Sequence, residues 1–344
     1  MKKLLLLALV LPLISIAQQT IYTNLVFEGG GIRGLAYAGA LKALEEKGIL
    51  NNIEKTGGTS AGAIAALMVS LNYSPKEIDS IMRNLDLEDF NDGRGGFIGK
   101  YTRLKRDYGM YHGRYLSKWL EEIIAAKTGN ANTTFTELHE LHLKDKSFKD
   151  LYCTGTNVSK QVVEVFSFES TPGMYLKTAV RISGSIPIYF DPVYIDSTGR
   201  EPEELVEGKE YQLYVDGGLI ANYPIGIFDT CLNGSNPLWC DQLKFNKATL
   251  GLKLERPQQI DSFHHSSTTI PPYKIKSLND YLIAFTNLMM ETLNRKSPGL
   301  ENEKGRTIYI SYGDISSRIR KTSENEKDAL FSNGYKAVQA FFSQ

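Results

Sequence analysis

A glycine-flanked serine constrains this chain more than any other stretch. The segment G-T-S-A-G at residues 58–62 precedes the small, apolar run 63–71. This spacing suits a tight strand-to-helix turn, because Gly58 and Gly62 let the helix approach the strand closely while Ser60 projects its hydroxyl. We interpret Ser60 as a nucleophile. The alternative is an ordinary glycine-rich turn that happens to contain a serine.

A second glycine-rich turn lies upstream. Residues 22–27 have the apolar character of a buried strand, and E-G-G-G-I-R-G at 28–34 breaks that strand sharply. Leucines and alanines then recur at helical spacing up to Gly48, and 53–56 supplies another short strand before the serine turn. Two strand–turn–helix units in succession predict an α/β fold, with a mainly parallel sheet covered by helices.

Composition excludes several classes of protein. The chain has 344 residues, of which 42% are hydrophobic, so it can bury a full core. Its formal net charge of zero argues against nucleic acid as a partner. The cysteines and histidines show no metal-ligand spacing such as C-x-x-C or H-E-x-x-H, so we predict no metal and no cofactor. Composition leaves the oligomeric state open.

The first residues resemble a targeting segment. A positive start is followed by the apolar run 4–14 and by small residues up to Ala17. This pattern predicts a signal peptide over 1–17 and an exported mature chain over 18–344, either periplasmic or secreted. In an exported chain Cys231 and Cys240 could form a disulfide across a short loop. Both states of this cysteine pair stay open at this stage.

Asp216 is the second candidate catalytic residue. The run 211–215 is strand-like and ends at Asp216-Gly217-Gly218, which predicts a carboxylate at the carboxyl end of a strand, where open α/β sheets place their sites. There the carboxylate could take the proton of Ser60 directly. The alternative is a turn aspartate, since D-G is a common turn pair.

Acyl transfer by serine also needs donors that face the oxyanion of the tetrahedral intermediate. A loop without side chains at the start of a helix can turn its N–H groups inward. We therefore expect an oxyanion hole from the backbone amides of Gly29, Gly30 and Gly31, with that of Ala61 added.

Two other functions use the same residues differently. Gly29, Gly31 and Gly34 spell G-x-G-x-x-G, with Glu54 near the spacing of a ribose-binding acid, which is typical of nucleotide binding. Against this, Glu54 falls inside the second strand region instead of at its carboxyl end. A Ser-His-Asp esterase of small soluble esters would need a histidine, and only His264 and His265 follow in the α/β-hydrolase chain order. That pair sits in a polar stretch over 257–272, which we predict to be a loop.

The motifs together resemble the patatin-like phospholipase family. The resemblance rests on E-G-G-G-I-R-G, G-T-S-A-G, A-V-R-I-S-G-S-I-P ending at Pro187, and D-G-G followed by N-Y-P. It also runs through G-M-Y-H-G-R-Y-L-S-K-W-L and T-T-F-T-E-L, so it covers Tyr22 to about Ile225 in the family's order.

This resemblance implies a three-layer α/β/α fold with a mainly parallel central sheet. It implies a Ser60–Asp216 dyad, an oxyanion hole from the Gly29 to Gly31 loop with Arg33 beside it, and hydrolysis of acyl esters of phospholipids, lysophospholipids or related lipids without a metal. The expected partner is therefore a lipid or a membrane surface. The residues expected to support the site are Arg33, Gly34, Gly58, Gly62, Gly217 and Gly218.

Two regions carry weaker expectations. We expect 18–344 to form a single domain, but strong motifs cover only 22–226, and substrate choice is expected to depend on 227–344. The stretch from Tyr101 to Tyr115 mixes aromatic and basic residues. We predict a solvated surface there, with contact to lipid head groups as the alternative.

Overall fold

The computed structural model describes residues 20–240, 242–264 and 305–343, together with residues 272, 275, 276, 281, 284 and 288. The predicted signal peptide lies outside these residues. The main sheet contains β1 (Asn24–Phe27), β2 (Lys55–Gly58), β4 (Asp150–Asn157), β5 (Val162–Phe166), β7 (Val193–Ile195), β8 (Gln212–Asp216), β11 (Thr249–Glu255) and β12 (Thr307–Ser311). Its order is β12-β11-β1-β2-β4-β8-β7, and β5 pairs with β4.

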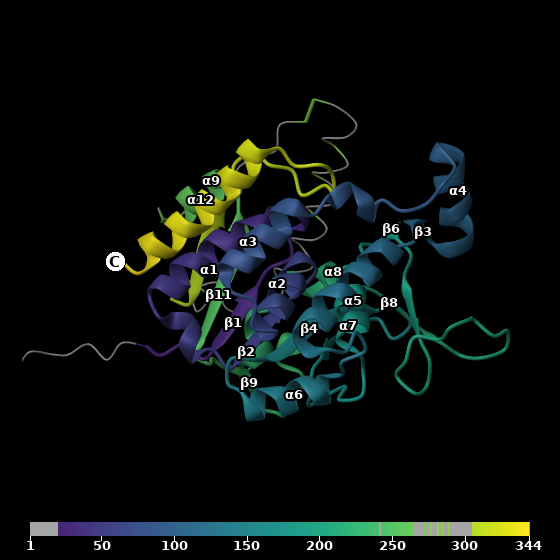
Figure 1. Ribbon diagram of the computed structural model, residues 1–344, viewed down its shortest axis with the longest axis horizontal. Helices are drawn as coiled ribbons and strands as arrows, with labels where there is room; N and C mark the ends of the chain where they lie inside the picture. The colour runs from purple at the N-terminus through teal and green to yellow at the C-terminus, as the bar shows by residue number, and fades with distance from the viewer. Residues whose placement is uncertain are drawn as a thin grey trace, which may run out of the picture.

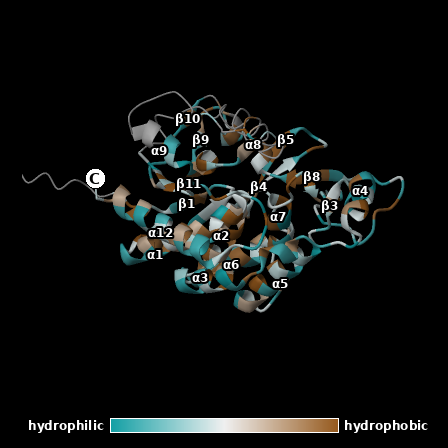
Figure 2. Ribbon diagram, turned by 90° about the horizontal axis from the view of Figure 1, so that it is seen from above, coloured by the Kyte–Doolittle hydropathy of each residue, from teal (hydrophilic) through white to brown (hydrophobic). Residues whose placement is uncertain are grey.

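Helices cover both faces of this sheet (Figure 1; Figure 2). The α-helices are α1 (Ala36–Glu46), α2 (Ala61–Ser70), α3 (Pro75–Asn84), α4 (Gly96–Asp107), α5 (Arg114–Thr128), α6 (Phe135–Lys144), α7 (Leu176–Ser183), α8 (Gly218–Ala221), α9 (Pro257–His264) and α12 (Glu324–Phe341). The 3₁₀ helices are η1 (Gly31–Leu35), η2 (Ile49–Asn52), η3 (Leu87–Phe90), η4 (Ile225–Phe228) and η5 (Pro237–Trp239). Two small sheets pair β3 (Gly109–Tyr111) with β6 (Ile188–Phe190), and β9 (Thr230–Cys231) with β10 (Leu243–Lys244).

The alternation of side chains along the strands explains the layers. On β1, Leu25 and Phe27 join the large core beneath α1 and α2, while Val26 between them joins a second cluster with Ile225 and Ile227 of η4. Successive strand residues point to opposite faces, so a strand that is apolar throughout must be covered on both sides. The central strands are apolar on both faces. The predicted α/β/α arrangement with a mainly parallel sheet is confirmed.

The parallel core of the sheet is formed by β12, β11, β1, β2 and β4. The strands β8 and β5 both run antiparallel to β4, and β7 runs antiparallel to β8. The two C-terminal strands therefore extend the same sheet on the far side of β1. Nothing in the sequence patterns of 227–344 indicated this position.

Part of the predicted 257–272 loop is helical. Residues 257–264 form α9, so the loop prediction is wrong there, and 265–271 lie outside the described residues. Pro257 occupies the first position of this helix, where its missing N–H has no helical partner to lose. Within the described ranges, no helix has the length and apolar character needed to cross a membrane.

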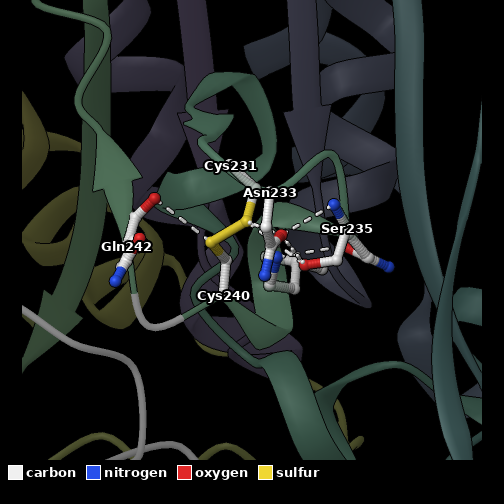
Figure 3. Close-up of a disulfide and its surroundings, with 7 residues drawn as sticks. Cys231, Asn233, Ser235, Cys240 and Gln242 are labelled. Carbon is white, nitrogen blue, oxygen red and sulfur yellow. Dashed lines mark hydrogen bonds between the residues drawn. A yellow bond between two sulfur atoms is a disulfide. The ribbon is translucent and has the colours of Figure 1, made fainter.

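Cys231 and Cys240, the pair whose state the sequence left open, form a disulfide (Figure 3). Their Cα atoms lie 5.8 Å apart, and the loop between them folds onto itself, with the backbone N–H of Ser235 donating to Asn233 Oδ1 at 3.0 Å. Cys153 is free and fully buried in β4, and burial raises the pKa of its thiol. A buried neutral thiol of this kind is unreactive.

Candidate active site

Ser60 occupies the turn between β2 and α2 in a backbone conformation that serine rarely adopts. Its φ is 55° and its ψ is −124°, and its side chain is almost fully buried. A non-glycine residue with positive φ costs on the order of 1–3 kcal/mol and persists only where the surroundings enforce it. Here the Ser60 N–H donates to Ser183 Oγ at 2.9 Å. A Cβ added at Gly62 would lie 2.4 Å from the carbonyl oxygen of Phe27, so only glycine permits this approach.

Asp216 ends β8, and its carboxyl group lies close enough to the Ser60 side chain for the serine to lower the pKa of the carboxyl group. The carboxyl group is buried, and the N–H of Gly218 donates to its Oδ1 at 2.7 Å. Burial raises the pKa of Asp216 to about 7, although the hydrogen bonds from Gly218 and Ser60 oppose that rise. A carboxylate with a pKa near neutrality is matched to accepting a proton from a hydroxyl at physiological pH.

Asp216 reaches Ser60 by a different route from the one that the sequence suggested. The strand β8 is antiparallel to β4, with Asp216 opposite Gly155, so β8 runs toward the parallel strands and its carboxyl end meets the carboxyl end of β2. In the sheet register Gly58 is opposite Cys153, and β4 continues to Asn157. The strand β4 extends beyond the end of β2, and β8 pairs with this extension. Because β8 is antiparallel, it ends close to the serine turn. The position was predicted, but the reason for it was not.

The glycine loop 29–31 lies beside Ser60. A Cβ added at Gly29 would be 3.2 Å from Ser60 Cβ, which places the two residues in direct contact. The Gly29 N–H, however, donates to the carbonyl oxygen of Asn222 at 2.9 Å, so it is not free to face a reacting group. Among the described residues, no acceptor is found for the amides of Gly30, Gly31 and Ala61. These three are the available donors.

The remaining predicted support residues all pack around this turn. Arg33 holds η1 to the C-terminal part of the chain, because its Nε donates to the carbonyl oxygen of Ile315 at 2.7 Å and its guanidinium lies 3.5 Å from the Tyr312 ring centroid. The glycines allow close contacts that a side chain would block. A Cβ added at Gly58 would meet the backbone of Gly62, and one added at Gly34 would meet Ala61 Cβ. A Cβ added at Gly217 would meet the side chain of Thr154. Gly218 supplies the N–H that binds Asp216.

Sequence reasoning missed the roles of Glu28 and Asn222. The buried Glu28 carboxylate accepts from the Leu254 N–H at 2.7 Å and from Asn222 Nδ2 at 3.3 Å, and burial raises the pKa of Glu28 to about 8. Asn222 Nδ2 also donates to the Gly29 carbonyl oxygen at 3.1 Å. The pair therefore fixes the glycine loop against β11. Both residues stand inside motifs that the sequence displays, but their types alone gave no sign of this bonding.

An apolar cavity that opens to solvent is lined in part by Ser60, and its empty volume, open solvent included, is about 800 Å³. Apart from the Ser60 and Tyr37 hydroxyls and the Trp119 indole N–H, the side-chain groups that line it are apolar. The lining residues are Gly31, Ile32, Gly34, Tyr37, Ala38, Ser60, Ala61, Ile64, Ala65, Met68, Ile78, Met82, Leu85, Leu87, Phe90, Leu116, Trp119, Gly184, Ile186, Phe190 and Ile319. They come from helices, from the segment between α7 and β6, from β6 itself and from the segment before α12. The apolar lining suits a hydrocarbon chain.

Comparison with known proteins identifies the family. The sequence profile described as "Patatin-like phospholipase" matches residues 25–229, which is more than half of the chain. The chain belongs to the patatin-like phospholipase family. The match begins at β1 and ends at Asp229, so it contains the serine turn, the glycine loop and Asp216, and it stops before β11 and β12.

Relatives of this patatin-like chain include viral proteins. An uncharacterized protein of Acanthamoeba polyphaga mimivirus is 31% identical over 318 residues, which cover 92% of each chain. The "Probable lipid hydrolase 463L" of Invertebrate iridescent virus 6 is 29% identical over 214 residues, covering 60% of this chain and 63% of that protein. Among solved structures, VipD from Legionella pneumophila superimposes with a TM-score of 0.62 at 16% identity, covering 94% of this chain and 67% of VipD. That likeness concerns the fold.

The alternative functions find little support in the patatin-like structure. Glu54 is exposed and precedes β2, so it lies at the amino end of the strand, opposite the glycine loop. Three described histidines have other partners, since His112 pairs with Asp191, His139 with Asp150, and His142 with the Phe148 carbonyl oxygen. His264 belongs to α9, and His265 lies outside the described residues.

One group of side chains has metal-ligand geometry. Candidate ligand atoms of Asp107, His112 and Asp191 lie within 4.8 Å of one another. The group sits between α4, β3 and β6 and contains neither Ser60 nor Asp216. Its side chains already have partners, because Arg106 Nη2 lies 2.8 Å from Asp107 Oδ2 and His112 Nδ1 lies 2.7 Å from Asp191 Oδ2. A search for spaced sequence motifs missed it because the three residues come from separate segments.

Proposed function

We propose that this patatin-like chain hydrolyses long-chain acyl esters of lipids through Ser60 and Asp216. The observation that carries the proposal is the strained, buried Ser60, which lies beside a buried carboxyl group and lines an apolar cavity. A nucleophile beside an apolar cavity matches an ester with a fatty acyl group. The family and the printed name of the iridescent-virus relative agree with this class of substrate.

In the proposed mechanism, Ser60 Oγ attacks the ester carbonyl carbon while Asp216 accepts the serine proton. The amides of Gly30, Gly31 and Ala61 would donate to the oxyanion of the tetrahedral intermediate. The proton on Asp216 passes to the departing alcohol oxygen, which leaves an acyl ester on Ser60. Asp216 then takes a proton from water, the resulting hydroxide attacks the acyl carbon, and Ser60 regains its proton as the fatty acid is released.

A fluorophosphonate probe, which reacts with activated serines, tests the nucleophile. Wild type should be labelled at Ser60 and Ser60→Ala should not be labelled, whereas Ser70→Ala, a change at another buried serine on α2, should keep the label. Lipid mass spectrometry on a membrane extract, with Ser60→Ala as the blank, would identify the lipid consumed. Labelling elsewhere, or equal lipid turnover by Ser60→Ala, would overturn the proposal.

The pKa of Asp216 sets an expected pH dependence. The base must be ionised, and its pKa is about 7, so kcat/KM for a soluble acyl ester should fall about tenfold per pH unit below pH 7 and level off above it. The measurement is a rate profile from pH 5 to pH 9, with circular dichroism at each pH to verify folding. A flat profile across pH 7 would show that Asp216 is not the base.

The cavity predicts selection by acyl-chain length. Ala65 lines the cavity on the same helix as Ser60, and Ala65→Leu would fill part of it. The ratio of turnover of a palmitoyl ester to that of a butyryl ester should fall about tenfold or more, because lost hydrophobic contact of this size discriminates by that amount. Using the ratio removes any general loss of folded enzyme. An unchanged ratio would place the acyl chain elsewhere.

Export also remains a proposal. The Cys231–Cys240 disulfide supports an oxidising compartment, in which such bonds persist. Cell fractionation followed by non-reducing peptide mapping should recover the protein outside the cytoplasm with this bond intact. Recovery in the cytoplasm with both thiols reduced would contradict it.

A further inference from the structure

The helix α4 stands apart from the helices that pack on the sheet. In Figure 1 and Figure 2 it lies at the edge of the molecule, beyond β3. Its outer face is apolar and aromatic, since the exposed fractions are 85% for Phe97, 79% for Ile98 and 54% for Tyr101. At about 100° per residue these three positions fall within one arc of the helix, together with Lys105. We call this face the α4 face.

Cationic side chains surround the α4 face. Residues 94–108 contain five basic side chains and one acidic one. Arg106 is paired with Asp107, but no carboxylate within the described residues lies at ion-pair distance from Arg94, Lys100 or Lys105. Lys105 Nζ instead lies 4.9 Å from the Tyr101 ring centroid. This mixture of apolar, aromatic and cationic groups is complementary to an anionic lipid surface, where aromatic rings enter the head-group region and ammonium groups meet phosphates.

Arg103 holds α4 in its exposed position. It is the one basic side chain of the helix that is buried, at 7% exposure. Its Nε donates to the Met110 carbonyl oxygen at 2.8 Å, and its Nη1 donates to the Arg94 carbonyl oxygen at 2.6 Å. The guanidinium therefore ties the loop before the helix to the strand after it. The apolar side chains of the α4 face are presented by an anchored element.

The small β3–β6 sheet connects this surface with the cavity. Gly109, two residues after the end of α4, pairs with Ile188 on β6. Ile188 has a φ of 69°, which β-branched residues rarely adopt, and its apolar side chain is 61% exposed. Its neighbours Ile186 and Phe190 both line the cavity. The exposed side chain of Ile188 thus lies on the short sheet that joins the end of α4 to the cavity wall.

We propose that the α4 face and Ile188 form a docking surface for an anionic lipid bilayer. Docking there would bring the cavity wall formed by Ile186 and Phe190 to the lipid interface, so that an acyl chain passes from bilayer to cavity without crossing water. That last consequence rests on the function proposed above; the binding itself does not. This proposal favours contact of Tyr101 with lipid head groups, the alternative named above, over the solvated surface predicted from the sequence.

Vesicle binding tests the proposal, with Ser60→Ala used throughout so that hydrolysis cannot alter the lipid. The probes are vesicles of phosphatidylcholine and vesicles of an equimolar mixture with phosphatidylglycerol. Ser60→Ala should sediment with the mixed vesicles. Adding Phe97→Ser and Ile98→Ser should lower the partition coefficient at least about tenfold, because two apolar side chains are lost from the lipid. Adding Lys100→Gln and Lys105→Gln should lower binding to the mixed vesicles alone.

A matched control is Leu143→Ser, since Leu143 is 61% exposed on α6, away from α4, and its replacement should leave binding unchanged. The proposal is overturned if Phe97→Ser/Ile98→Ser binds as well as its parent, or if the parent binds neither vesicle. Light scattering provides a further check. A dimer in solution that these two substitutions dissociate would show that a second copy of the chain occupies the face, and would also overturn it.

Turnover of a soluble butyryl ester separates this proposal from the proposed function. With Ser60 intact, Phe97→Ser/Ile98→Ser should hydrolyse that ester at the wild-type rate but lose activity on vesicles. An inactive wild type that still binds vesicles through the α4 face would refute the hydrolase and leave the docking surface standing.

Discussion

Replacement of Asp216 by asparagine is expected to lower kcat for acyl esters by about 10⁴-fold. An asparagine side chain has nearly the same shape, and it can still accept a hydrogen bond from the Gly218 N–H. It cannot take the proton of Ser60, so the hydroxyl stays a weak nucleophile. The rate should approach that of Ser60→Ala, which is measured as the residual rate without the nucleophile. Activity within tenfold of wild type would remove Asp216 from the mechanism.

This substitution needs a chemical precaution and offers a second readout. Asparagine before Gly217 deamidates to aspartate, so fresh protein and an Asp216→Ala variant should be assayed together. Because the folded-state pKa of Asp216, about 7, exceeds the usual value near 4, the folded state binds more protons than the unfolded state between these values. The stability of wild type therefore falls as pH rises through that range, and Asp216→Asn should raise the Tm more at pH 8 than at pH 5.

Arg306→Ala is expected to lower the free energy of unfolding by about 3–5 kcal/mol. Arg306 precedes β12, and its Nη1 and Nη2 each donate to an Asp229 carboxylate oxygen at 2.6 Å. The Arg306 side chain is 6% exposed and that of Asp229 is 0% exposed. Removing the arginine leaves a buried carboxylate with the Asn246 N–H as its one remaining hydrogen-bond donor among the described residues. Urea denaturation monitored by circular dichroism measures the loss.

Two variants distinguish this effect from ordinary side-chain truncation. Arg306→Met/Asp229→Leu should recover most of the stability, because it removes both buried charges and fills the space. Asp328→Ala removes a partner of Arg83 whose side chain is 68% exposed, and should cost no more than about 1 kcal/mol. A loss for Arg306→Ala as small as that of the surface variant would mean that the buried pair contributes little.

The sequence predicted those features of the site that depend on local backbone geometry. The turns that carry the candidate residues Ser60, between Gly58 and Gly62, and Asp216, before Gly217, could be located because tight turns accept few residue types. The bonding of the Gly29 amide to Asn222 could not be found, since it joins segments far apart in the chain. Because the Gly29 amide is already bonded, the expected oxyanion donors are the amides of Gly30, Gly31 and Ala61.

The rest of the fold escaped prediction for a related reason. An isolated apolar run such as β11 or β12 reads as a strand, but its place in the sheet is set by pairing with β1, which no local pattern records. The direction of β8 was missed for the same reason. The exposure of the α4 face is also a tertiary property, because an amphipathic helix pattern does not tell whether its apolar side meets protein.

The position of β11 beside β1 limits how this protein can be shortened. A fragment that stopped at Asp229, where the family match ends, would keep Ser60, the glycine loop and Asp216. It would also remove the partner from one side of β1 and leave an apolar, unpaired strand edge, which can recruit other chains into aggregates. Expression trials and gene fusions should therefore place their boundaries beyond α12, because the most recognisable part of the chain is not a unit that can be cut out.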